Sequence, residues 1–169
     1  MSLSAPPPSS HDGAPFSIGI VAARFNPTLV DALLRSVCEM LAASGVKAKR
    51  VTVLRVPGSH EVPWAAQALA RRRDCDCVIA LGVLIAGDTN HHEMVGQSVS
   101  VALQQVALAT DKPVINGVMV VNNRKQAEER CVGAINRGGE FASAALEMAA
   151  LKRFLRAAPR PRKPAGGKS

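Results

Sequence analysis

Apolar runs of strand length recur along the chain and are separated by amphipathic stretches. The runs are rich in valine, isoleucine, leucine and alanine, which is typical of parallel strands covered on both faces. The run at 77–84 holds no charged side chain or side-chain amide, so we expect it to be a central strand. Strands are predicted at residues 16–22, 50–56, 77–84 and 113–121.

Helical periodicity fills the intervals between these strands. Leu29, Leu33 and Val37 recur at every fourth residue, and Thr28 is predicted to cap this helix with Asp31 as its capping-box partner. Strands that alternate with helices predict an α/β protein, a flavodoxin-like three-layer αβα sandwich with a four-stranded parallel sheet. Further helices are predicted over residues 64–72, 90–109, 125–131 and 139–155.

Polar or glycine-containing loops follow all of these strands. In a parallel sheet the carboxyl ends of the strands meet at one edge, where α/β proteins bind their ligands. We therefore expect one small-molecule site at that edge. The loops are Arg24-Phe25-Asn26, residues 57–61, residues 87–92 and Asn122-Asn123.

The loop at 87–92 carries the strongest chemical signal. Gly87, Asp88 and Thr89 precede a predicted helix, so their backbone N–H groups suit an anion, although the Asp88 carboxylate opposes one unless it turns away. His91 and His92 are adjacent, which is not the spacing of a metal pair. One of them is either a general acid–base or a surface or capping histidine. No phosphate-loop or dinucleotide motif is present, and no metal site is predicted.

Three other residues have a functional and a structural interpretation. Arg130 either pairs with a phosphate or forms a surface ion pair with a neighbouring glutamate, and its position alone favours the ion pair. Phe25 either stacks on a flat ligand or fills the core. Glu61 is either a polar anchor for the ligand or an acid at a helix start.

Charge, aromatic content and length limit the possible partners and the number of domains. The formal net charge is +8, of which the segment 157–169 contributes four positive charges and no acid. This tail is predicted to be disordered and solvated rather than a nucleic-acid ligand, and the five aromatic residues are too few for a stacking surface. The rest is expected to be one domain over 16–156, after a disordered or loosely ordered arm over 1–15.

The chain shows neither a secretory signal nor an apolar run long enough to span a membrane. We therefore predict a cytoplasmic protein without a membrane partner. The four cysteines include only one close pair, Cys75 and Cys77, whose spacing fits neither zinc nor redox motifs. Reduced thiols are expected.

Taken in order, the motifs resemble the lumazine synthase family. The resemblance covers residues 16–154, nearly the whole predicted domain. The matching pieces are Ala23-Arg24-Phe25-Asn26, the segments 56–63 and 82–95, Pro113-Val114, Gln126-Ala127 with Arg130, and Asn136-Arg137-Gly138 with Glu140.

The resemblance implies a reaction without metal or organic cofactor. A ribitylamino-pyrimidinedione condenses with 3,4-dihydroxy-2-butanone 4-phosphate, and phosphate and water are released in riboflavin biosynthesis. It implies that His91 transfers protons and that Arg130 binds phosphate with Asp88 and Thr89. The residues implied to contact the pyrimidine and ribityl groups are Phe25, Ser59, His60, Glu61, Val83, Leu84, Ile85 and Asn116, with Arg137 and Glu140 in support as a pair.

The chain also departs from the family pattern. His60 stands where an aromatic residue is common, Ala86 where an arginine is common, and Asn116 where a phenylalanine reaches into the neighbouring subunit's site. The resemblance implies homopentamers with active sites between subunits. The turn at 132–137, which influences whether pentamers assemble into a shell in this family, is one residue shorter than usual, so the resemblance does not fix the larger assembly. A catalytically weak relative that binds a flavin or lumazine is the alternative function.

Overall fold

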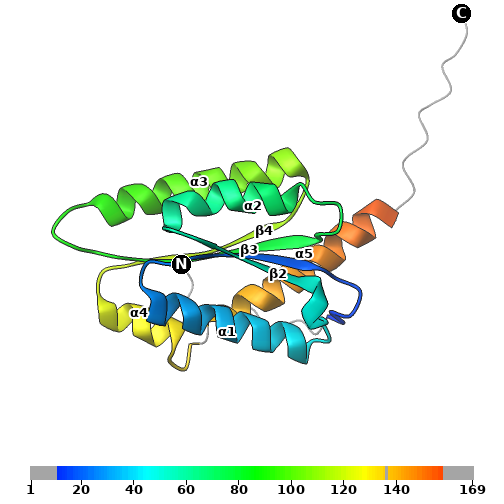
Figure 1. Cartoon of the computed structure of the whole chain (residues 1–169), viewed down its shortest axis with the longest axis horizontal. Helices are drawn as coiled ribbons and strands as arrows, with labels where there is room; N and C mark the ends of the chain where they lie inside the picture. The colour runs from blue at the N-terminus through cyan, green and yellow to red at the C-terminus, as the bar shows by residue number, and fades with distance from the viewer. Residues whose placement is uncertain (1–10, 136, 158–169) are drawn as a thin grey trace, which may run out of the picture.

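Four parallel strands form the centre of the molecule, in the spatial order β2-β1-β3-β4 (Figure 1). A computed structural model describes residues 11–135 and 137–157. Ile18 of β1 lies opposite Val51 on one side and Cys77 on the other, so the strands begin nearly level. The strands are β1 (Ile18–Ala23), β2 (Val51–Val56), β3 (Cys77–Ile85) and β4 (Val114–Val121).

A helix follows each strand, and the helices cover both faces of the sheet (Figure 1). Helices α2 and α3 pack together on one face, whereas α1, α4 and α5 pack on the other. This arrangement confirms the predicted αβα sandwich. The helices are α1 (Pro27–Ala43), α2 (Val62–Ala70), α3 (His91–Thr110), α4 (Arg124–Cys131) and α5 (Arg137–Ala157), with short 3-10 turns at Ala48–Arg50 and Ser59–Glu61.

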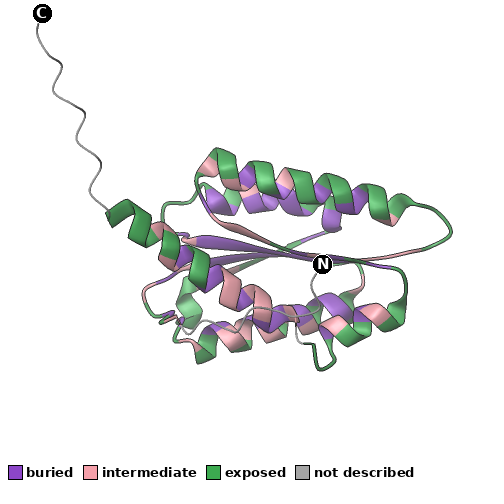
Figure 2. Cartoon of the chain, turned by 180° about the vertical axis from the view of Figure 1, so that it is seen from behind, coloured by how far each residue is buried: buried purple, intermediate pink, exposed green. Residues whose placement is uncertain are grey.

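The two central strands are buried from both sides. All six residues of β1 and the first seven of β3 are buried, which confirms the prediction of a central strand at 77–84 (Figure 2). Alternate side chains enter different layers: Ile20 packs with α1 and α5, whereas Val21 packs with α2 and α3. The sheet is therefore a rigid platform between two apolar cores.

The start of α1 differs from the prediction. Asn26 is the residue before the helix, in the left-handed conformation (φ 53°), and it makes no side-chain cap hydrogen bond. Thr28 is inside the helix, so the predicted capping box with Asp31 is wrong. Pro27 fixes the first helical residue instead. Asp31 forms an ion pair with Arg55 at the end of β2, 2.5 Å apart.

The end of the predicted N-terminal arm makes defined contacts. Gly13 is buried, and its N–H donates to the Ser44 carbonyl at 2.7 Å. Arg50 donates to the Pro15 carbonyl, also at 2.7 Å. Residues 11–15 therefore lie against the turns after α1 and before β2. Residues 1–10 of the arm and 158–169 of the tail lie outside the described residues.

The four cysteines are free thiols. Burial raises the pKa of Cys131 to about 11 and raises that of Cys77 further. These two thiols are therefore protonated at neutral pH and are poor nucleophiles. Within the described residues, no helix combines the length and hydrophobicity that a membrane crossing requires.

Candidate functional site

A cavity of about 460 Å³ opens at the carboxyl edge of the sheet. It lies between the loops that follow β1, β2 and β3 and the first turns of α3. Three of the predicted loops therefore converge on one site. Its lining residues are Phe25, Asn26, Gly58, Ser59, His60, Glu61, Val83, Leu84, Ile85, Gly87, Thr89, His91, His92 and Val95.

The loop after β1 is held over the floor of the cavity. The Asn26 side-chain amide donates to the Val83 carbonyl at 2.9 Å, and the Arg24 N–H donates to the Val56 carbonyl at the same distance. These two bonds tie the loop to β3 and β2. Phe25, between them, is 71% exposed, so its ring is available at the rim and does not fill the core.

The loop after β2 presents one oriented carboxylate and one buried hydroxyl. The Gly58 N–H donates to one Glu61 carboxylate oxygen at 2.7 Å, which fixes the side chain and leaves the other oxygen without a hydrogen bond among the described residues. Ser59 is buried, and its Oγ has no hydrogen-bond partner among the described residues. A buried hydroxyl without a partner is costly unless a ligand engages it. His60 next to it is exposed.

Gly82 on β3 makes room for the Ser59 hydroxyl. A methyl group on Gly82 would overlap Ser59 Oγ and approach Ser59 Cβ at 3.3 Å. We expect Gly82→Ala to lower the free energy of unfolding by about 1–3 kcal/mol, because the packed loop must move.

Denaturant unfolding of a double-mutant cycle checks this contact. Combining Gly82→Ala with Ser59→Ala removes the overlapping oxygen, so we expect about 1 kcal/mol of the loss to be recovered. Gly87→Ala, in open space on the next turn, is the matched control. Strictly additive effects in the cycle would contradict the predicted overlap.

The two histidines stand at the amino end of α3. His91 is its first residue and is exposed, whereas His92 is partly buried, with Nδ1 3.4 Å from the Thr89 carbonyl. Both line the cavity, together with Gly87 and Thr89. The free N–H groups and dipole of a 20-residue helix favour an anion here. Asp88 is exposed and does not line the cavity.

The other predicted site residues do not reach this cavity within the chain. Arg130 lies on α4 and donates to the Gln126 carbonyl at 3.0 Å. Among the described residues it forms no ion pair with Glu128 or Glu129, and Glu128 pairs with Arg124 at 2.8 Å. Helix α4 packs with α1, in the layer opposite to α3 (Figure 1). Arg130 is therefore separated from His91 by the sheet.

Arg137, Glu140 and Asn116 are also outside the cavity. Arg137 and Glu140 form the predicted ion pair at the start of α5. Asn116 lies on the edge strand β4, where its side chain donates to Ser100 Oγ at 3.3 Å and accepts from the Val118 N–H at 3.0 Å. The Asn116 side chain therefore satisfies the backbone N–H of Val118, which has no neighbouring strand to pair with at this edge of the sheet.

Sequence reasoning assigned no site role to four lining residues, Asn26, Gly58, His92 and Val95. For the histidine pair, it gave a role only to His91. Asn26 carried a readable signal, because asparagine before proline at a helix start tolerates the left-handed conformation. Its bond to Val83 depends on the pairing of β1 with β3 and could not be read from spacing. Among the described residues, no group of three or more His, Cys, Asp or Glu side chains could hold a metal ion.

The fold and the cavity together define a class: an α/β protein whose strand-end loops surround a cavity, with a helix N-terminus suited to an anion and two histidines at its wall. The family model of 6,7-dimethyl-8-ribityllumazine synthase matches residues 15–153. The chain therefore belongs to the lumazine synthase family.

Individual relatives match most of the chain. The 6,7-dimethyl-8-ribityllumazine synthase of Aquifex aeolicus (strain VF5) is 43% identical over 139 residues, which are 82% of this chain and 90% of the relative. The protein of that name from Polaromonas sp. (strain JS666 / ATCC BAA-500) is 42% identical over 140 residues, 83% and 89%. The one from Thermococcus onnurineus (strain NA1) is 42% identical over 143 residues, 85% and 93%.

Proposed function

We propose that this chain is a 6,7-dimethyl-8-ribityllumazine synthase, a transferase of riboflavin biosynthesis. It condenses 5-amino-6-(D-ribitylamino)uracil with 3,4-dihydroxy-2-butanone 4-phosphate and releases phosphate and water. The observation that carries the proposal is the cavity that joins a helix-end anion site, a histidine pair and an oriented carboxylate in a chain of this family. Much of the rate is expected from holding two substrates in register.

The cavity suggests a role for each group. Phe25 stacks on the pyrimidine from the rim, and Val83, Leu84 and Ile85 form the floor beneath it. The Glu61 carboxylate, oriented by Gly58, accepts hydrogen bonds from the ring and ribityl groups. The unpartnered Ser59 hydroxyl donates a hydrogen bond to these groups or accepts one from them. His60 forms a more polar wall than an aromatic side chain would.

The phosphate end of the ketone is proposed to lie at the turn before α3. There the backbone N–H groups around Asp88 and Thr89 face an anion at the positive end of the helix dipole. His91 is then close to the bonds that form and break, and it moves protons during Schiff base formation and phosphate release. The proposal uses no metal and no organic cofactor.

We propose that the active site is completed by a second subunit, as in a homopentamer. Arg130, Arg137, Glu140 and Asn116 do not line the cavity of their own chain, and a neighbouring copy supplies them. An exposed apolar surface supports assembly: Met94, Val101 and Leu108 recur every seven residues on α3, 68%, 58% and 75% exposed. Trp64 on the adjacent α2 is 77% exposed. Such a surface is typical of subunit contacts.

A biosynthetic enzyme acting on small phosphorylated metabolites is expected in the cytoplasm.

The purified full chain tests the function directly. Mixing it with the two substrates and following lumazine absorbance is expected to give product well above the uncatalysed background. Riboflavin binding is measured on the same sample. Tight binding of riboflavin by a folded oligomer that forms no product above background would instead favour a flavin- or lumazine-binding protein. The departures from the family pattern at His60, Ala86 and Asn116 would then explain the lost activity.

A further inference from the structure

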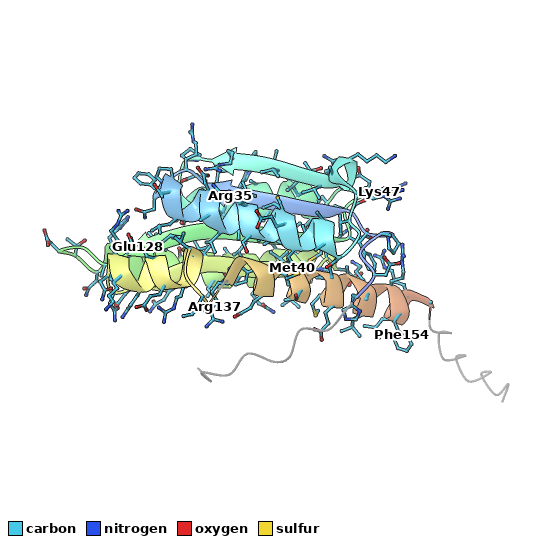
Figure 3. All side chains as sticks on the ribbon, turned by 90° about the horizontal axis from the view of Figure 1, so that it is seen from below. Arg35, Met40, Lys47, Glu128, Arg137 and Phe154 are labelled. Atoms are coloured by element: carbon cyan, nitrogen blue, oxygen red, sulfur yellow. The ribbon has the colours of Figure 1, made fainter. Side chains whose placement is uncertain are left out.

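Cationic side chains gather at the amino edge of the sheet, opposite to the candidate active site. They come from three parts of the chain: the turn before β2, the segment between α2 and β3, and the last turn of α5. Lys47 and Phe154 mark this end in Figure 3, and Glu128 marks the other end. We name as the basic strip the exposed residues Lys49, Arg50, Arg71, Arg72, Arg73 and Arg156.

Two cavities along this edge join these residues into one surface. The larger, about 420 Å³, lies between the ends of α2 and α3, and its cationic lining is Arg71, Arg72, Arg73, Lys112 and Arg156. The smaller, about 70 Å³, is lined by Lys49, Arg50 and Arg72 together with Asp74 and uncharged residues. Arg72 borders both cavities, so the strip is continuous from β2 to α5.

The acids at this edge neutralise only part of the strip. Arg72 pairs with Asp74 at 2.7 Å, which lowers the pKa of that carboxyl. Asp111 lies 3.4 Å from Arg156 and 3.5 Å from Lys152, and Asp76 accepts from the Ser17 N–H.

The other cations of the edge differ in availability. Lys112 is buried and donates to the Arg72 and Cys75 carbonyls in the segment between α2 and β3, so it is engaged within the chain. Lys49, Arg71 and Arg73 have no side-chain partner among the described residues. A surface with surplus cations and open cavities attracts a polyanion.

We infer that the basic strip binds the phosphate backbone of single-stranded nucleic acid without reading its bases. Neither cavity lining contains an aromatic side chain on which a base could stack. The strip bends around the edge of the sandwich, from the α2 side to α5, and a flexible strand follows such a path more easily than a stiff duplex. Beyond Ala157 the sequence adds Arg160, Arg162, Lys163 and Lys168.

Charge in the tail alone favours a solvated end, whereas the structure adds a cationic surface on the folded domain. The strip is at the opposite edge from the cavity that holds His91, so binding does not depend on the proposed activity. A chain that binds RNA and makes no lumazine, or the reverse, separates the two proposals.

Fluorescence anisotropy of a labelled oligouridylate, titrated with full-length protein at several salt concentrations, tests the inference. The strip variant carries Lys49→Gln, Arg71→Gln and Arg73→Gln. We expect it to bind about tenfold or more weakly at low salt, and the log–log salt slope to fall by about 2, since each single-strand phosphate contact contributes about 0.7. The matched control carries Arg35→Gln, Arg124→Gln and Lys125→Gln, with the same loss of charge, and is expected to bind nearly as wild type.

A second variant separates the strip from the tail. It replaces Arg160, Arg162, Lys163 and Lys168 by glutamine in the full chain, and we expect it to retain most of the binding. The inference is overturned if the wild-type chain does not bind oligouridylate at low salt, or if the control variant loses as much affinity as the strip variant. It is also overturned if the tail variant alone abolishes binding, or if duplex DNA or phosphatidylglycerol vesicles bind more tightly than the single strand.

Discussion

Mixing two inactive variants of this chain is expected to restore lumazine synthesis. His91→Ala removes the proposed proton-transfer group and Arg130→Ala the proposed phosphate cation, and each is expected to lower turnover by about a hundredfold. If each site joins the cavity of one subunit to Arg130 of the next, a mixed oligomer contains some sites with both groups intact. Random assembly of equal amounts gives about a quarter of the wild-type activity.

The measurement compares co-expressed chains with separately purified ones. Absorbance assays at equal subunit concentration are run on each variant, on the co-expressed mixture and on a chain that carries both changes. In the double variant every subunit carries both defects, so no site has both groups intact and activity stays at background. Arg124→Ala, on the same helix and paired with Glu128, is the control for surface charge on α4. A mixture no more active than the mean of its components would place Arg130 and His91 in the same subunit's site.

Leu33→Ala is expected to cause the largest loss of stability among single changes in α1. Leu33 is fully buried between α1 and the sheet, with Val30 and Val37 in the same core, and a methyl group on Gly138 at the start of α5 would lie 2.8 Å from its backbone carbonyl. Removing its branched end leaves a cavity among rigid neighbours. The expected loss is about 2–5 kcal/mol of unfolding free energy, a large part of the stability of a typical domain.

Urea unfolding followed by circular dichroism measures this effect at one fixed subunit concentration, because assembly contributes to apparent stability. Leu33→Met keeps the volume and is expected to cost less than about 1.5 kcal/mol. Arg35→Ala, exposed on the same helix and labelled in Figure 3, is expected to change stability by less than about 0.5 kcal/mol. A Leu33→Ala effect as small as that of Arg35→Ala would contradict the assignment of this residue to the core.

The cavity shows how far residue order predicts a site. Phe25, Glu61 and His91 were expected at one edge only because each follows a predicted parallel strand, and that argument placed all three at the same cavity. Arg130 also follows a strand, β4, yet it lies in the opposite layer. The helices after β1 and β4 cover one face of the sheet, and the helices after β2 and β3 cover the other. The spacing of residues along the chain does not predict which face each helix covers.

The N-terminal end of α1 shows the same limit locally. Thr28 and Asp31 have the spacing of a capping box, yet Asn26 and Pro27 begin the helix two residues earlier. The Asn26 side chain bonds to Val83 on a strand that is distant in sequence, and Asp31 bonds to Arg55. Tertiary partners therefore overrode a valid local signal.

Residue order alone predicted the strands, the helices, the parallel sheet and the family, because periodicity and ordered motifs are properties of that order. The folded arrangement was needed to show which loops share a cavity, which carboxylate Gly58 orients, and that Lys49, Arg71 and Arg156 form one cationic edge. Each of these depends on strand order and on the side of the sheet that every crossover takes. Both are fixed by packing between segments far apart in the chain, where apolar burial selects one arrangement from several with the same local pattern.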